Sequence, residues 1–211
     1  MENMENIMVK TVIGSFDSVD DANRAVRELR AAGFVERDIN LIANNVQRGV
    51  ATEGHDNAAA TGAVAGGALG GAAGLAASLM GLAIPGIGPI LAAGPIVAAL
   101  AGAGAGAVAG GLIGGLAELG VEKDEAEIYA ESVRRGGSLV TIRADESRAD
   151  EATEILRDAG AVDIDRRVEE WRSSGWSGYD ASAEPFSFEE IERNRTRYGR
   201  RTDQSGRMGR S

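Results

Sequence analysis

The sequence predicts an α+β fold: a ferredoxin-like β-α-β-β-α-β domain, split by an inserted Gly/Ala-rich antiparallel helical hairpin and followed by a flexible C-terminal tail. Three observations in the 211 residues support this prediction. A strand–helix–strand pattern occurs twice, residues 57–117 contain no charged residue, and the composition changes again near Trp171. The expected parts are therefore a split domain (residues 1–50 and 121–170), a hairpin (57–119) and a tail (171–211).

The first β-α-β unit begins with a strand over residues 7–16, which are rich in Val, Ile and Thr. Ser18 has the residue type that caps a helix, and acidic residues in the next turn favour the helix dipole. Gly33 stands where a left-handed cap would end that helix. Residues 38–43 alternate in hydrophobicity and predict the second strand.

The second unit repeats this order. Residues 138–144 predict a strand, residues 147–159 a helix capped by Gly160, and residues 162–168 a fourth strand. The sequence Leu-Arg-Ala-Ala-Gly that ends at Gly33 aligns with Leu-Arg-Asp-Ala-Gly, which ends at Gly160. Two such units form a four-stranded ferredoxin-like sheet covered by two helices on one face.

The second face of that sheet needs a cover, either another protomer or an additional helix. Residues 122–135 predict that helix, because acidic residues stand at its start and Arg134 and Arg135 at its end. Gly136 and Gly137 would terminate it just before the third strand.

The charge-free segment, residues 57–117, holds 21 Ala and 17 Gly. Residues 85–89 (Pro-Gly-Ile-Gly-Pro) predict a turn between helices at about 62–84 and 95–117. Each helix would be about 35 Å long, enough to cross the ~30 Å hydrocarbon core of a bilayer. Glycines recur at every fourth position in both helices and predict close helix packing and oligomer contacts: Gly62, Gly66, Gly70, Gly74, Gly102, Gly106, Gly110 and Gly114.

Three environments fit such a segment. The first is lipid, although the nearest charged flanks are acidic and give poor support from the positive-inside rule. The second is the shared apolar core of a soluble homo-oligomer. The third is a flexible linker, which the interspersed Leu, Ile and Val and the regular glycine period disfavour. A lone hairpin would not be stable in water, because each helical Gly costs about 1 kcal/mol relative to Ala.

The tail combines aromatic and basic residues. Its aromatic part could dock on the domain, bind a partner or anchor at a membrane interface: Trp171, Trp176, Tyr179 and Phe186. Residues 193–211 hold seven Arg and one acidic residue, in a chain whose net charge is -10. Such a tail could fold over its own acidic domain, bind a neighbouring protomer, or contact anionic lipid or nucleic acid, or stay solvated.

The sequence resembles the bacterial general stress protein family of the heat-induced YflT type, with a glycine-zipper insertion. The most specific stretch is residues 125–142 (EAEIYAESVRRGGSLVTI), an acidic helix with Tyr followed by Arg-Arg-Gly-Gly and an apolar strand. Residues 12–34 and the tail elements Trp171, Gly175-Trp176 and Pro185-Phe186 are also similar to parts of that family. The resemblance implies a stress-linked, often membrane-annotated protein, and it implies no catalytic residue.

Catalytic chemistry has little support. Cysteine is absent, and the single histidine, His55, lies in a polar stretch before the hairpin. No phosphate-binding G-x-x-x-x-G-K-[ST] sequence occurs, and the G-x-G patterns near Gly102 do not follow a strand. The sequence therefore predicts no catalytic, cofactor-binding or metal-ligating residue.

The expected function is that of a non-enzymatic, stress-associated protein. It would self-associate and bind membrane lipid through the hairpin, with its domain in the cytoplasm, since the N-terminus MENMENIMVK lacks the features of a signal peptide. A soluble homo-oligomeric assembly protein is the alternative, and a small-ligand sensor is a more distant one that rests on fold analogy alone. Nucleic acid is not an expected partner.

Overall fold

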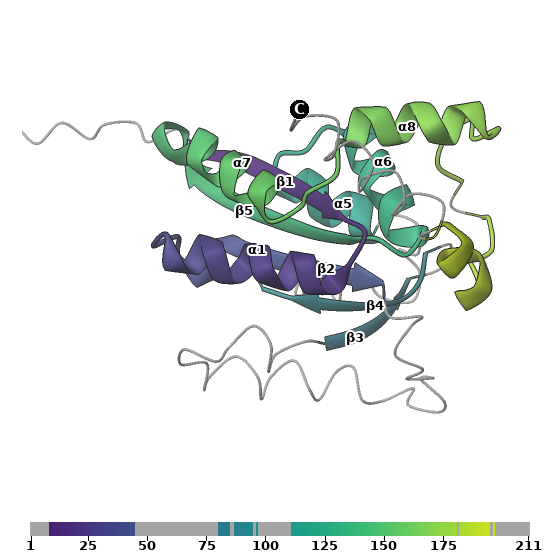
Figure 1. Ribbon diagram of the computed structural model, residues 1–211, viewed down its shortest axis with the longest axis horizontal. Helices are drawn as coiled ribbons and strands as arrows, with labels where there is room; N and C mark the ends of the chain where they lie inside the picture. Colours follow the sequence, from purple (N-terminus) through teal and green to yellow (C-terminus); the bar gives the residue numbers. More distant parts are fainter. Residues whose placement is uncertain are drawn as a thin grey trace, which may run out of the picture.

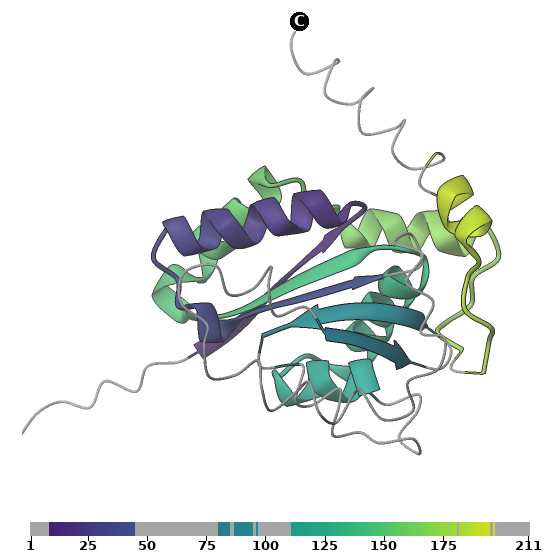
Figure 2. The ribbon, with the colours of Figure 1, turned by 90° about the horizontal axis from the view of Figure 1, so that it is seen from below.

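The computed structural model describes residues 9–44, 80–84, 87–94, 96, 111–180, 182–194 and 196. They form a mixed α+β fold around an antiparallel sheet with the strand order β1-β5-β2-β4-β3 (Figure 1). Helices lie on both faces of the sheet, as Figures 1 and 2 show from two directions.

The first β-α unit forms as predicted. Strand β1 (Val9–Phe16) leads into helix α1 (Val19–Ala31), whose N-terminus is capped by the Ser18 side chain. Gly33 ends the turn after α1 with a φ of +85°, the left-handed conformation that its position predicted. A short 3-10 turn (Glu36–Asp38) then leads into β2 (Ile39–Asn44), in which every residue is buried.

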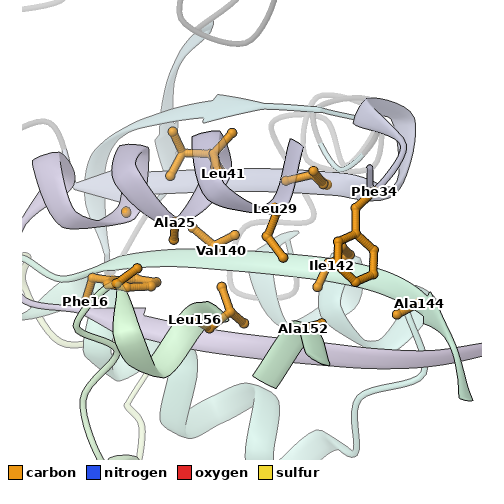
Figure 3. Packing of buried hydrophobic residues seen from close by; sticks show 14 of the residues in the cluster. Phe16, Ala25, Leu29, Phe34, Leu41, Val140, Ile142, Ala144, Ala152 and Leu156 are labelled. Carbon is orange, nitrogen blue, oxygen red and sulfur yellow. The ribbon is translucent and has the colours of Figure 1, made fainter. Parts of the chain in front are cut away.

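The second unit matches the first in its strand and helix. Strand β5 (Ser138–Asp145) lies between β1 and β2 and is antiparallel to both. A 3-10 turn (Glu146–Arg148) precedes helix α7 (Ala149–Asp158), and Gly160 adopts a φ of +97°. Helices α1 and α7 bury one face of β1, β5 and β2 in a cluster that includes Phe16, Leu29, Leu41, Val140, Ile142 and Leu156 (Figure 3).

The predicted fourth strand, residues 162–168, is wrong. Only its start touches the sheet, where the Val162 N–H donates to the Ser15 carbonyl on the outer edge of β1 at 2.8 Å. The Asp163 side chain then accepts from the Arg166 N–H and begins helix α8 (Ile164–Ser173). A capping acid with a second acid in the first turn favours a helix more strongly than the alternating Val and Ile favour a strand.

The predicted helix 62–84 is wrong at its described end, whereas the predicted helix 95–117 is helical at its described end, residues 111–117. Residues Met80–Ile84 form strand β3 and Gly88–Ala93 form strand β4, so the predicted turn at 85–89 joins two strands. Strand β4 pairs with β2, whose residues are all buried and whose second edge would otherwise lack a partner. Asn40 strengthens this junction, because its side-chain oxygen accepts from the Ile96 N–H at 2.8 Å.

The second face of the sheet is covered by helices α5 (Gly111–Glu118) and α6 (Lys123–Arg134). The helix predicted over residues 122–135 thus forms and supplies the expected cover. Ile42, Leu139 and Ile90 from the sheet pack there against Leu112 and Leu116 of α5 and against Ala126, Tyr129, Ala130 and Val133 of α6. The sheet therefore has a hydrophobic core on each side.

Candidate functional site at the end of helix α6

A cluster of charged and polar side chains lies where α6 ends and the Gly136-Gly137 turn enters β5. Its centre is Glu131, whose side chain is fully buried. The Glu131 carboxylate accepts hydrogen bonds from Arg135 at 2.6 Å and from Arg134 at 3.3 Å. Burial raises the pKa of Glu131 above its ordinary value, and the two adjacent guanidinium groups oppose that rise.

The two arginines are covered by aromatic rings from the C-terminal part of the chain. The guanidinium carbon of Arg135 lies 4.9 Å from the ring centre of Trp171 and 5.3 Å from that of Phe186. The corresponding atom of Arg134 lies 4.8 Å from the Phe186 ring. These distances are within the range of cation–π attraction, so the rings and charges stabilise one another.

Hydroxyl and amide groups tie α6 to the sheet. The Ser132 and Ser15 hydroxyls are 2.7 Å apart, which joins α6 to β1. The Asn44 amide donates to the Val133 carbonyl at 2.9 Å, which joins α6 to β2. These buried bonds fix the position of the helix end that carries Glu131, Arg134 and Arg135.

Helix α8 is attached by an ion pair. Arg167 donates to both carboxylate oxygens of Asp17, at 2.8 and 2.9 Å, a paired geometry that is stronger than a single contact. Between this pair and the α6 turn lies a cavity of about 20 Å³, enough for about one water molecule. It is lined by Asp17, Ser132, Arg135, Gly136, Gly137, Arg167, Trp171 and Asn194.

The aromatic residues of the predicted tail pack against helices rather than the open sheet face. Trp171 lies within α8, so the predicted boundary at residue 171 falls inside a helix, and its ring is buried beside Trp176 with 5.6 Å between ring centres. Tyr179 packs at the margin of the α5–α6 core. Further along, the fully buried Ile191 fills the space over Gly136.

Several buried polar atoms of this cluster have no hydrogen-bond partner among the described residues: Arg134 Nε, Trp171 Nε1, Trp176 Nε1 and Tyr179 Oη. Burial is the main cause that raises the pKa of Tyr179. The aromatic rings of this cluster therefore contribute apolar contact area and cation–π contacts rather than hydrogen bonds. Their effect is to stabilise the packing of the C-terminal region on α6.

The predicted glycine contacts fall almost entirely outside the described residues: Gly62, Gly66, Gly70, Gly74, Gly102, Gly106 and Gly110. Gly114 lies on α5 and is exposed, and no described atom lies within 4 Å of a Cβ built on it. His55 also lies outside the described residues. Within the described part of the chain, no group of acidic or histidine side chains has the arrangement of a metal site.

Sequence reasoning placed Arg134, Arg135 and the glycine turn at the end of a helix, but it missed Glu131, Asp17 and Arg167 as a connected set. The spacing of Glu131 from Arg134 and Arg135 is the i, i+3 and i, i+4 spacing of helical ion pairs and could have indicated the first group. The Asp17–Arg167 pair joins residues 150 positions apart, and no local pattern indicates it.

Comparisons with family models, with curated proteins and with solved structures found no match to this chain. Among the described helices, none is both long enough and apolar enough to span a membrane.

Proposed function

We propose that the protein is a non-enzymatic assembly protein that forms a homo-oligomer through its charge-free segment, residues 57–117. The observation that carries this proposal is the position of β3, which is an edge of the sheet among the described residues and comes from that segment. Met80–Ile84 contains no charged residue or proline, the features with which proteins usually prevent edge strands from pairing with other chains.

The strands also limit how the segment could cross a membrane. With β3 beginning at Met80, a helix from residue 62 has at most 18 residues, about 27 Å, before the sheet. With α5 packed on α6 from Gly111 onward, about 15 residues remain for a helix after β4, or about 22 Å. The second length falls short of a hydrocarbon core of about 30 Å, which disfavours a hairpin of two spanning helices.

The proposed lack of enzymatic activity rests on the ion pairs that the charged side chains of the candidate site form with one another. Glu131 is paired with two arginines, and Asp17 with Arg167, while the cavity between them holds only about one water. A substrate would therefore have to displace ion pairs that hold α6 and α8 in place.

The resemblance of residues 125–142 to the general stress protein family supports a role under stress. We further propose that the domain derives from a ferredoxin-like sandwich, with the order β1-β5-β2 of its first three strands and with α8 in place of the fourth. Strands β4 and β3 would then extend the opposite edge of that sheet.

Cell fractionation with a carbonate wash of the membranes, followed by sizing without detergent, tests the assembly. We expect an oligomer in the soluble fraction. Gly70→Leu and Gly106→Leu should weaken it because they place side chains in the proposed backbone contacts, while the matched changes Ala68→Leu and Ala107→Leu should weaken it less. A monomer at micromolar concentration would overturn the proposal.

Association with the surface of a lipid bilayer is the second candidate, favoured by the 61-residue absence of charge. Protein that stays with carbonate-washed membranes and is monomeric in buffer would support lipid association instead of the homo-oligomer.

A further inference from the structure

A groove of about 330 Å³ runs beside the outer edge of β1, on the face of the sheet that α5 and α6 cover. Its walls are Val9, Lys10, Thr11 and Ile13 from β1, and Leu119, Gly120, Val121 and Glu125 from the junction of α5 and α6. The Thr11 hydroxyl donates to the Leu119 carbonyl and fixes the two walls together.

The backbone of β1 offers hydrogen-bonding groups along this groove. The Ser15 carbonyl accepts from Val162, so it points away from β5. Because backbone groups alternate in direction along a strand, those of Val9, Thr11 and Ile13 point to the same outer side. Among the described residues, no strand pairs with that side of β1.

The rim of the groove is acidic. Glu118, Glu122, Asp124 and Glu125 lie exposed where α5 passes into α6. Lys10 is paired with Glu146 at 2.7 Å, and Lys123 lies 3.6 Å from Glu127, whereas Arg143, opposite Thr11 on β5, is exposed. An extended segment that binds here would gain from a basic composition.

Residues 197–211 form a basic segment of this kind, and the chain just before them lies close to β1. Residues 197–211 contain five Arg and one Asp. Asn194 lines the same small cavity as Asp17, the residue directly after β1. Fifteen extended residues reach about 50 Å, roughly twice the length of an eight-residue strand.

We propose that residues 197–211 bind within the same molecule as an added strand in this groove. Their backbone would pair with Val9, Thr11 and Ile13, and their arginines would face the acidic rim. The tail would thereby cover the β1 edge and leave β3 as the edge available for assembly.

The absence of cysteine allows a direct test in the full chain. A nitroxide label on Ser205→Cys should broaden the amide resonances of residues 9–13 by NMR, and should leave those of β3 sharp because β3 lies at the opposite edge of the sheet. Isotope-labelled protein without nitroxide, mixed with unlabelled spin-labelled protein, should show no broadening, because the contact is within one molecule.

Two pairs of variants identify the contact. Thr11→Pro removes one outward N–H and should abolish the broadening, whereas Thr11→Val removes only the hydroxyl and should keep it. Glu118→Gln with Glu122→Gln should reduce the broadening severalfold at low salt, whereas Glu154→Gln with Asp158→Asn on α7 should not. Spectra of each variant with the remaining peaks in place show that the domain is folded.

Broadening that is absent from residues 9–13, or that persists in Thr11→Pro, would overturn the proposal. Broadening in the mixed sample would show that the tail of a second copy binds, which also overturns it. These outcomes are independent of the sizing experiment, since a monomer can carry the tail in its own groove.

Discussion

Glu131 is fully buried, and its carboxylate is paired with Arg134 and Arg135. A buried carboxylate with a raised pKa takes up a proton in the folded state more readily than in the unfolded state. Its contribution to stability is therefore complete below the unfolded pKa, about 4.5, and is lost as the pH rises through the folded pKa.

Glu131→Gln removes this titration and leaves Arg134 and Arg135, which are mostly buried, without their carboxylate. Because the raised pKa means that the neutral form of this side chain is favoured in the folded state, we expect Glu131→Gln to be at least as stable as the wild type at pH 7. Urea unfolding should show the wild type gaining stability relative to Glu131→Gln as the pH is lowered from 7 towards 4.5. A wild type that loses stability relative to Glu131→Gln over this range would contradict the raised pKa.

Gly136 meets two constraints at one position. Its φ is +98°, and a Cβ there would overlap the side chain of Ile191. Gly33 has a similar φ of +85°, but no described atom lies within 4 Å of its Cβ position. Alanine substitutions at Gly33 and Gly136 therefore separate the free-energy cost of the left-handed backbone conformation from the cost of overlap with Ile191.

Gly33→Ala should cost about 1 kcal/mol from backbone strain alone. Gly136→Ala should cost about 3 kcal/mol, because overpacking adds to the same strain. Combining Gly136→Ala with Ile191→Ala should recover part of the difference in a double-mutant cycle of unfolding free energies. Equal losses for the two single alanine variants would mean that Ile191 does not pack on the turn.

At the scale of elements, α8 and the segment after it act as one cover for the end of α6. Trp171, Phe186 and Ile191 come from three parts of the C-terminal region and contact the same Arg-Arg-Gly-Gly turn. The tail that the sequence predicted thus includes packed residues up to Ile191, which is fully buried.

Truncating the chain at two positions should show which part of the C-terminal region is needed for folding. A chain ending at residue 170 loses Trp171 and Ile191, and we expect no cooperative thermal transition, because removing one buried Trp alone costs about 3–5 kcal/mol. A chain ending at residue 196 keeps these contacts and should melt within a few degrees of the full chain in circular dichroism. Normal melting of the shorter chain would show that the C-terminal cover is dispensable.

For the whole molecule, the described parts of the charge-free segment belong to the folded domain. Strand β4 pairs with β2, and α5 supplies Leu112 and Leu116 to the second core. Residues 1–50 and 121–170 therefore do not contain the complete sheet that the duplicated β-α-β pattern predicted.

Joining residues 1–50 to residues 121–211 by a short Gly/Ser linker should leave the free edge of β2 and much of the second core exposed. We expect this deletion variant to aggregate or to lose its cooperative melt, because several large apolar side chains lose their cover. Keeping residues 80–120 as well should restore the transition. A cooperative melt in the smaller variant would contradict the integrated sheet.

Local sequence patterns predicted the elements whose causes lie within a few residues. Ser18 caps α1, Gly33 and Gly160 provide left-handed turns, and the apolar spacing in residues 122–135 predicts the helix that covers the second face. These features depend on neighbours within a few residues, so a local pattern is sufficient to indicate them.

Tertiary structure decided the strands of the charge-free segment and the composition of the site. Gly, Ala and Ile in residues 80–93 are compatible with either a helix or a strand, and the open edge of β2 selects the strand. Residues 162–168 are likewise compatible with a strand or a helix. Val162 forms one hydrogen bond with β1, and the Asp163 side chain then caps helix α8. Asp17 and Arg167, and Trp171 and Arg135, meet only because the sheet and α6 bring distant segments together.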